Sequence, residues 1–460
     1  MKPRLLVTIA IAGCVPPRDA VFGPVGREVD RRVGARATWD EHVDPRGPAA
    51  VASLLEKPLD RDTAVRIALA TNRRLQAQYD QLGIAASEIA SATVLAPLEV
   101  DVKTKRALGG SGDEVDLDVT QDVLGLVQLP QRRAVAQADL AAARARAVAA
   151  TVDLVARVEL AYLDVVATQQ ELELRQTTFD AAAAAAELAE RQRSAGNISE
   201  LALARELEQR EQARIDLGRV QVDVEAKREA LNEVLGLSGE ATRWTVTYRL
   251  AELPAAMPTL DDLERDAVAS SLALEAIRGE ADAAAGRVGL ARVRAWIPKL
   301  GVGMSAGHRD GEWDAGPALS IGLPLFDQQQ GPRARAHAEL KRARNEAIAT
   351  AVELRARARA VRQRVIGAYA EARHLRDVVL PQRQRIVDET LKQYNAMNAS
   401  TFELLVTRRE LVDAGRQYID ALRRFWRTSA EARALTRGAM LHAGPDDPRL
   451  RAPATSSEGH

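Results

Sequence analysis

The sequence contains two copies of one unit, and this duplication restricts the possible folds more than any other feature. Residues 59–97 match residues 260–298 at an offset of 201, and both segments begin with Leu-Asp and end in proline. The same register returns further along, where residues 134–140 match 334–340 at an offset of 200 and residues 196–199 match 397–400 at 201. A register shared at three places indicates a tandem repeat of roughly 200 residues, so both copies should fold alike.

Each copy is dominated by long helices. We expect a helix, two short strands, a very long helix, a tight turn and another long helix in each. No proline occurs in residues 131–253, and apolar residues recur there at steps of four and three, as in a coiled-coil seam. The sequence predicts one helix over residues 131–194, roughly 96 Å long at about 1.5 Å per residue, and a counterpart over 332–394. Helices of this length cannot wrap around a single core.

The predicted strands form one hairpin in each copy, at about residues 98–123 and 300–324. Apolar residues such as Val100, Val102, Met304 and Leu319 alternate with polar or small ones. One interpretation is a surface hairpin that rests its apolar face on the helices. The other is a set of membrane-crossing strands, which need only about 9 to 11 residues. Four strands cannot close a barrel, so other copies would be needed. Two copies would give eight strands filled by their own side chains and three would give twelve around an aqueous lumen; the charged face favours three.

The single cysteine, Cys14, follows a basic start and a short apolar run. This segment looks like a bacterial lipoprotein signal, in which residues 1–13 are removed and the thiol of Cys14 is acylated. Val15 in the next position suggests sorting to the outer membrane. The alternatives are an ordinary export signal and a buried free cysteine. Beyond this segment no stretch approaches the roughly 18 to 20 apolar residues of a transmembrane helix.

Composition excludes several classes of function. The 64 basic and 64 acidic residues cancel, so the chain offers no general attraction to nucleic acid. The six histidines are scattered without ligand spacing, and one cysteine cannot build a Cys-based zinc site. No nucleophile motif or phosphate-binding loop is present. We therefore expect neither an enzyme nor a bound metal or cofactor.

From about Leu59 to Gly438 the pattern resembles the TolC-like outer-membrane efflux family. The residues that carry the resemblance are Ala96-Pro97-Leu98, Trp296-Ile297-Pro298, Gly316 to Asp327 (GPALSIGLPLFD), Gln393-Tyr394-Asn395, Phe402-Glu403-Leu404-Leu405, Tyr418-Ile419 and Phe425-Trp426. The later motifs are most similar to the branch that serves resistance-nodulation-division pumps for heavy metals.

The resemblance implies a mainly helical homotrimer: a twelve-stranded barrel in the outer membrane continued by a long α-helical tunnel in the periplasm. Its partners would be a periplasmic adaptor protein, an inner-membrane resistance-nodulation-division pump and outer-membrane lipid. The chain would then be a passive exit duct, whose cargo could be metal ions, drugs or a secreted protein. A non-pore coiled-coil scaffold is the alternative from another class.

The resemblance also assigns candidate residues. The helical tips that would meet the adaptor lie at residues 193–200 and 394–401, and their candidate contacts are Gly196, Asn197, Ser199, Met397, Asn398 and Ser400. Gly196 suits the left-handed conformation that ends a helix, whereas Met397 in the matching place implies a turn closed through Asn395 or Asn398. Glu403 would form a constriction around the threefold axis, or else pair with Arg408 or Arg409.

The remaining segments complete the expected organisation. Residues 14–58 are rich in Pro, Gly and Arg and are expected to form an extended anchor, and residues 244–248 a short strand. The full order is a signal peptide at 1–13, the anchor at 14–58, the first repeat at 59–236, a linker at 237–259, the second repeat at 260–442 and a disordered tail at 443–460.

Overall fold

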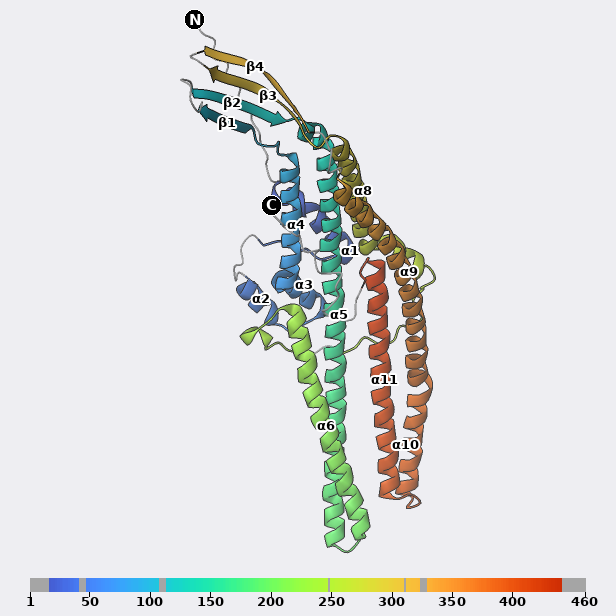
Figure 1. Cartoon of the computed structure of the whole chain (residues 1–460). Coiled ribbons are helices and arrows are strands. Elements are labelled where there is room, and N and C mark those ends of the chain that lie inside the picture. The colour runs from blue at the N-terminus through green and yellow to red at the C-terminus, as the bar shows by residue number, and fades with distance from the viewer. Residues whose placement is uncertain are drawn as a thin grey trace. The chain divides into compact units, whose positions relative to one another are not determined.

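The computed structural model describes residues 16–40, 47–106, 113–246, 249–309, 312–322 and 329–440. Cys14, the signal peptide, the C-terminal tail and the tips of both β-hairpins lie outside the described residues. The chain divides into two compact units, and its two longest helices continue from one unit into the other (Figure 1). The first unit comprises the described residues of Met1–Glu28, Ala77–Val148 and Leu272–Val352, and the second those of Val29–Gln76, Ala149–Ser271 and Glu353–His460.

The first unit contains a four-stranded antiparallel sheet (Figure 1). Its strands are β1 (Glu99–Arg106), β2 (Asp113–Asp122), β3 (Leu300–Arg309) and β4 (Glu312–Ile321), in that order across the sheet. Pairing of β2 with β3 joins the hairpin of one repeat to that of the other, with Val119 opposite Met304. The predicted hairpins and their alternation are therefore confirmed, and β1 and β4 are the two edges of this sheet.

The two faces of the sheet differ in chemistry. On one face, Lys103 donates to Asp118 at 3.1 Å and Lys105 donates to Asp116 at 3.0 Å. The other face is apolar and exposed; its exposed members include Val100, Val102, Met304, Leu319 and Ile321. The hairpins do not rest their apolar face on the helices, so that interpretation is wrong for this chain.

Helix α8 (Leu272–Trp296) packs closely on the first part of α5 (Leu124–Ser194) in the same unit. A Cβ atom at Gly279 would lie 3.0 Å from the Cβ of Ala142, so a larger residue there would push the two helices slightly apart. Arg287 pairs with Asp139 at 2.6 Å beside the same contact. The unit also contains most of α4 (Arg73–Thr93) and the first part of α9 (Gln330–His374).

The N-terminal segment is helical, which corrects the extended anchor expected for residues 14–58. Helices α1 (Arg18–Val33) and α2 (Gly47–Leu55) lie within it. Val21 and Val25 are buried four residues apart, and the ring of Phe22 packs edge-on against Tyr79 at 5.0 Å. The glycines and the proline of this segment lower helix propensity, but burial of one apolar side of the helix overrides that weak preference.

The second unit is built on two antiparallel helical hairpins (Figure 1). In the first, α6 (Glu200–Leu235) runs beside α5, and Arg175 of α5 forms an ion pair with Asp216 of α6 at 3.4 Å. In the second, α10 (Leu380–Asn395) runs beside α11 (Thr401–Thr436), with an ion pair between Arg383 and Glu410. The shorter helices of this unit are α3 (Arg61–Thr71), η1 (Gly239–Thr242) and α7 (Leu263–Ser270).

The helix expected to run unbroken over residues 332–394 is interrupted. After α9 it widens into one π-helical turn, η2 (Leu375–Val379), before α10 begins. Pro381 lies in the first turn of α10. Proline has no N–H to donate and its ring clashes with the carbonyl four residues earlier, so the turn before it must depart from α-helical bonding.

The segment that joins the repeats is held by side chains of α9, η2 and α11. Trp426 donates from Nε1 to the carbonyl of Ala251 at 2.7 Å, and Tyr369 donates to that of Pro254 at 3.1 Å. Arg376 donates to Leu253 at 3.1 Å. Residues 244–246 are not in a strand, and residues 247–248 lie outside the described part. These linker carbonyls belong to no β-sheet, so they accept their hydrogen bonds from side chains instead.

No helix among the described residues has a stretch long and apolar enough to cross a bilayer.

Candidate functional site

The first hairpin of the second unit ends in a tight turn between α5 and α6. Gly196 adopts a φ of 76°, and its N–H and that of Asn197 donate back to Arg193 and Gln192 at 3.0 and 2.8 Å. This is the Schellman arrangement that satisfies the last carbonyls of a helix. Ser199 then accepts a hydrogen bond from the N–H of Ala202 and starts α6. The left-handed glycine expected at Gly196 is confirmed.

The second turn, between α10 and α11, has the same bonds without glycine. Met397 itself adopts a φ of 61°, and the N–H groups of Met397 and Asn398 donate to Tyr394 and Gln393 at 2.9 and 2.8 Å. Ser400 accepts from the N–H of Glu403 at 3.1 Å. The N–H of Asn398 therefore helps to close this turn, as expected, but the left-handed residue is Met397, because the bonding pattern imposes that conformation on the residue that matches Gly196.

Met397 is therefore strained, and its side chain is 94% exposed. A left-handed conformation costs a residue with a Cβ about 1 to 2 kcal/mol. We expect Met397→Gly to stabilise the turn by about 1 kcal/mol, seen as roughly five-fold slower amide exchange at Asn398 and Ala399. Gly196→Ala is the matched control and should weaken the first turn by a similar amount. Faster or unchanged exchange in Met397→Gly would contradict this account of the turn.

A cation–π contact joins the two hairpins near their tips. The guanidinium of Arg205 on α6 lies 5.5 Å from the ring centroid of Phe402 on α11. Phe402 is the repeat counterpart of Leu201. The sequence motif around Phe402 pointed to this region, but no spacing rule pairs an arginine with a ring 197 positions away.

Glu403 lies in the first turn of α11, beside a hollow of about 300 Å³. The hollow is lined by Arg385, Ile386, Glu389, Thr390, Gln393, Ala399 and Glu403. Within the described residues, Glu403 forms no ion pair with Arg408 or Arg409, since residues five and six positions along a helix face other directions. That alternative is therefore wrong, and the carboxylate of Glu403 stays exposed.

The helices α5 and α11 are joined by a line of ion pairs. Glu159, which is buried, lies 3.2 Å from Arg437 and 3.6 Å from Arg433. Further along, Arg427 pairs with Asp164. Burial lowers the pKa of Arg433, and the nearby Glu159 carboxylate opposes that shift. The contact between the two hairpins is thus ionic on this side.

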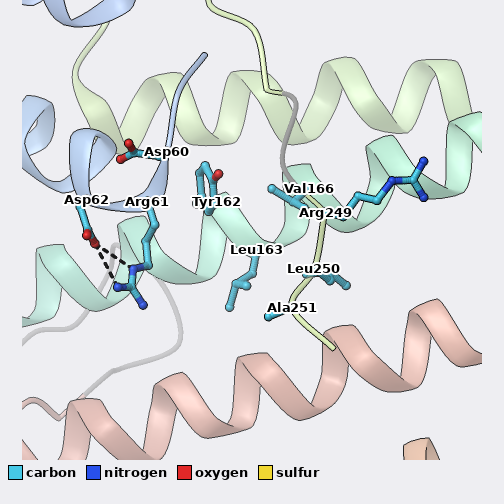
Figure 2. A pocket seen from close by; sticks show the side chains of 9 residues that line it. All are labelled: Asp60, Arg61, Asp62, Tyr162, Leu163, Val166, Arg249, Leu250 and Ala251. Atoms are coloured by element: carbon cyan, nitrogen blue, oxygen red, sulfur yellow. Dashed lines mark hydrogen bonds and ion pairs between the residues drawn. The ribbon is translucent and has the colours of Figure 1, made fainter. Parts of the chain in front are cut away.

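A larger hollow of about 410 Å³ lies between the start of α3, α5 and the linker (Figure 2). Its polar residues already have structural roles. Asp60 caps α3 through the N–H of Thr63 at 2.6 Å, Arg61 pairs with Asp62 at 3.0 Å, and Arg249 pairs with Glu173 at 2.6 Å. Tyr162 donates to the carbonyl of Leu59. The hollow is therefore a packing feature of the linker rather than a reactive site.

No group of three or more histidine, cysteine, aspartate or glutamate side chains within the described residues could hold a metal ion.

No family model matches the chain. Its sequence is 24% identical over 374 residues to the cobalt-zinc-cadmium resistance protein CzcC of Cupriavidus metallidurans, covering 79% of this chain and 87% of that protein.

Solved structures with the same fold include the outer membrane channel CmeC of Campylobacter jejuni. It superposes with a TM-score of 0.66 at 13% identity, over 84% of this chain and 87% of that one. The outer membrane protein VceC of Vibrio cholerae superposes with a TM-score of 0.60 at 15% identity, over 88% and 98%. The chain has the TolC-like outer-membrane channel fold. In this chain, the six tip candidates lie in the two turns, and Glu403 lies in the first turn of α11.

Proposed function

We propose that this chain is the outer-membrane exit duct of a tripartite efflux system and that it passively conducts heavy-metal cations. The observation that carries the proposal is the sheet, which exposes a largely apolar face and ends in two strand edges with no partner strand within the described residues. Such a sheet is stable only where lipid covers the apolar face and further strands cover the edges. Three copies supply twelve strands, enough to enclose a water-filled lumen.

The polar face of the sheet supports a cationic cargo. In β1 and β2 this face carries six carboxylates and two lysines: Glu99, Asp101, Glu114, Asp116, Asp118, Asp122, Lys103 and Lys105. The facing part of β3 has Gly301, Gly303 and Gly307, which add no charge. An excess of carboxylates around a lumen attracts cations and repels anions. The similarity to CzcC supports metals as the cargo.

The two helical tips are the surfaces proposed to meet the periplasmic adaptor, and through it the inner-membrane pump. Gly196, Asn197 and Ser199 form one tip, and Met397, Asn398 and Ser400 the other. Exposure of an apolar side chain on a strained residue at the second tip supports a docking role, because neither property stabilises the free chain. Acylation of Cys14 is proposed to add a lipid anchor.

Glu403 is proposed to form the narrowest acidic ring of the duct. Glu403→Lys would replace three carboxylates by three ammonium groups, and we expect single-channel currents to lose their cation preference. Glu240→Lys is the control, since Glu240 pairs with Arg243 at 2.8 Å on an exposed turn. Unchanged conductance and unchanged cation preference in Glu403→Lys would show that Glu403 does not form the acidic ring.

The function is tested by deleting the gene and measuring sensitivity to copper, zinc, cobalt and a panel of drugs. Increased sensitivity to metals, restored by the wild-type gene, is the expected result. Sensitivity to drugs alone would assign the duct to drug export. Recovery of the chain in the soluble fraction without detergent would contradict the duct function and favour a coiled-coil scaffold.

A further inference from the structure

The helices of the first unit are basic where they join the sheet (Figure 1). The ends of α4, α5, α8 and α9 nearest to the sheet in the chain are residues 89–98, 123–138, 283–298 and 330–338. These ends contain seven arginines and no aspartate or glutamate, although the whole chain has 64 basic and 64 acidic residues. We call the seven the arginine belt: Arg132, Arg133, Arg287, Arg292, Arg294, Arg333 and Arg335. Positive charge is thus concentrated beside the sheet.

Three members of the arginine belt have no partner in the described part of the chain. Four members are bonded within the protein, as Arg287 is to Asp139 at 2.6 Å. The other three, Arg133, Arg292 and Arg333, are exposed and form no ion pair with any described residue. Arg333 also lies in the first turn of α9, where the helix dipole disfavours a cation. These charges do not stabilise the free chain, which indicates an anionic partner outside it.

Exposed apolar side chains lie between the free arginines and the sheet. At the end of α8, Trp296 is 80% exposed and follows Arg292 by four residues, so both lie on one side of the helix. At the start of α5, Leu126 is 50% exposed and precedes Arg133 by seven residues, which again places both on one side. Along both helices, leading away from the sheet, an exposed apolar group is therefore followed by a free guanidinium group.

This order matches the layers of a bilayer surface. In the proposed duct, hydrocarbon covers the apolar face of the sheet. Tryptophan favours the level of the lipid headgroups, and a long arginine side chain can reach the phosphates from there. Arg292 lies about 6 Å along α8 from Trp296, at about 1.5 Å per residue. Unpaired arginines in the lumen would repel a cationic cargo, so we place these groups on the lipid side.

We propose that the arginine belt, with Trp296, binds the headgroups of anionic phospholipids in the periplasmic leaflet of the outer membrane. This inference rests on the proposed function, which places the sheet in a bilayer. One arginine near a membrane surface strengthens the binding of anionic lipid about five-fold. The belt would hold the sheet at a fixed depth in a chain whose strands carry few aromatic side chains.

Fluorescence quenching in phosphatidylcholine vesicles that contain the full-length protein tests the inference. The vesicles receive phosphatidylglycerol or phosphatidylcholine brominated near the headgroup end of its chains, and the difference made by Trp296→Phe gives the quenching of Trp296. We expect phosphatidylglycerol to bind beside Trp296 about five times more strongly than phosphatidylcholine. This ratio should fall to about one in roughly 1 M salt. It should fall equally in the triple variant Arg133→Gln, Arg292→Gln, Arg333→Gln.

The matched control is the triple variant Arg74→Gln, Arg243→Gln, Arg265→Gln. It removes the same charge from exposed positions of the second unit and should keep the preference for phosphatidylglycerol. Equal binding of the two lipids beside Trp296 in the wild-type chain would overturn the inference. So would a preference that survives the loss of the three free arginines of the belt.

Trp313 separates failure of this inference from failure of the proposed function. Trp313 lies opposite His308 on the apolar face of the sheet and is 66% exposed, so Trp313→Phe reports whether the sheet is in the bilayer. If brominated lipid quenches Trp313 but not Trp296, a second copy or another protein covers the belt; the inference is then overturned and the duct stands. If neither tryptophan is quenched, both fail.

Discussion

Replacing Trp244 by alanine is expected to destabilise the end of α6 by about 4 kcal/mol. Trp244 is 1% exposed, and its Nε1 donates to Oδ1 of Asn232 at 2.7 Å. The guanidinium of Arg228 lies 4.1 Å from the indole centroid and donates to the Trp244 carbonyl at 2.8 Å. Alanine would leave a cavity, an unsatisfied buried amide and an arginine without its ring.

Amide exchange in α6 measures this loss as the opening free energy of residues 228–235. Trp244→Phe keeps most of the ring and loses the N–H, so it should cost about 1 to 2 kcal/mol. Adding Asn232→Ala to Trp244→Phe should then cost less than the two single changes together, because their shared hydrogen bond is already gone. A loss below about 1 kcal/mol for Trp244→Ala would contradict the packing described for this residue.

Replacing Glu159 by glutamine is expected to weaken the contact between α5 and α11 by about 3 kcal/mol. The carboxylate is buried between Arg433 and Arg437, and a neutral side chain would leave two partly buried guanidinium groups facing each other. Arg437 also accepts a hydrogen bond at its carbonyl from Arg32 at 2.8 Å, so the loss should spread to α1.

The matched control for Glu159→Gln is Glu173→Gln on the same helix. Glu173 pairs with Arg249 at 2.6 Å, but both side chains are largely exposed, so its loss should cost less than about 1 kcal/mol. Amide exchange in the last turns of α11 reports both changes. Equal effects of the two variants would show that burial of Glu159 contributes nothing to the stability of the contact between α5 and α11.

These stability effects bear on function because the ion pairs join the two hairpins that carry the tips. Glu159 and its arginines lie at the C-terminal end of α11, whereas Arg205 meets Phe402 at its N-terminal end, so the two hairpins are joined at both ends and losing the ion pairs removes the joint farther from the tips.

The sequence predicted the features that follow from periodicity and repetition. Alternation identified the strands of both hairpins, and the repeat offset located both turns. The exposed apolar face of the sheet could also be predicted, because charged residues such as Lys103 and Asp118 occupy the other face. These features depend on local order in the chain, which a single sequence displays directly.

Other features depend on distant contacts and were missed. Helix α1 forms because Val21 and Val25 are buried, although Gly23, Pro24 and Gly26 lower its propensity. Met397 is left-handed because the hydrogen bonds of the turn require it, although methionine does not favour that conformation. The conformation of the linker also depends on distant contacts, because its carbonyls accept hydrogen bonds from side chains such as Trp426, which lies 175 positions from its acceptor. Such contacts have no signal in spacing or composition.

The measurement that tests the central proposal most directly is electrical recording from the purified full-length protein in a planar lipid bilayer. The proposed duct predicts discrete, cation-preferring channels from a detergent-extracted trimer, with the preference lost in Glu403→Lys and kept in Glu240→Lys. A chain that inserts as a folded trimer and conducts no ions, or that stays in solution without detergent, would contradict the proposed function.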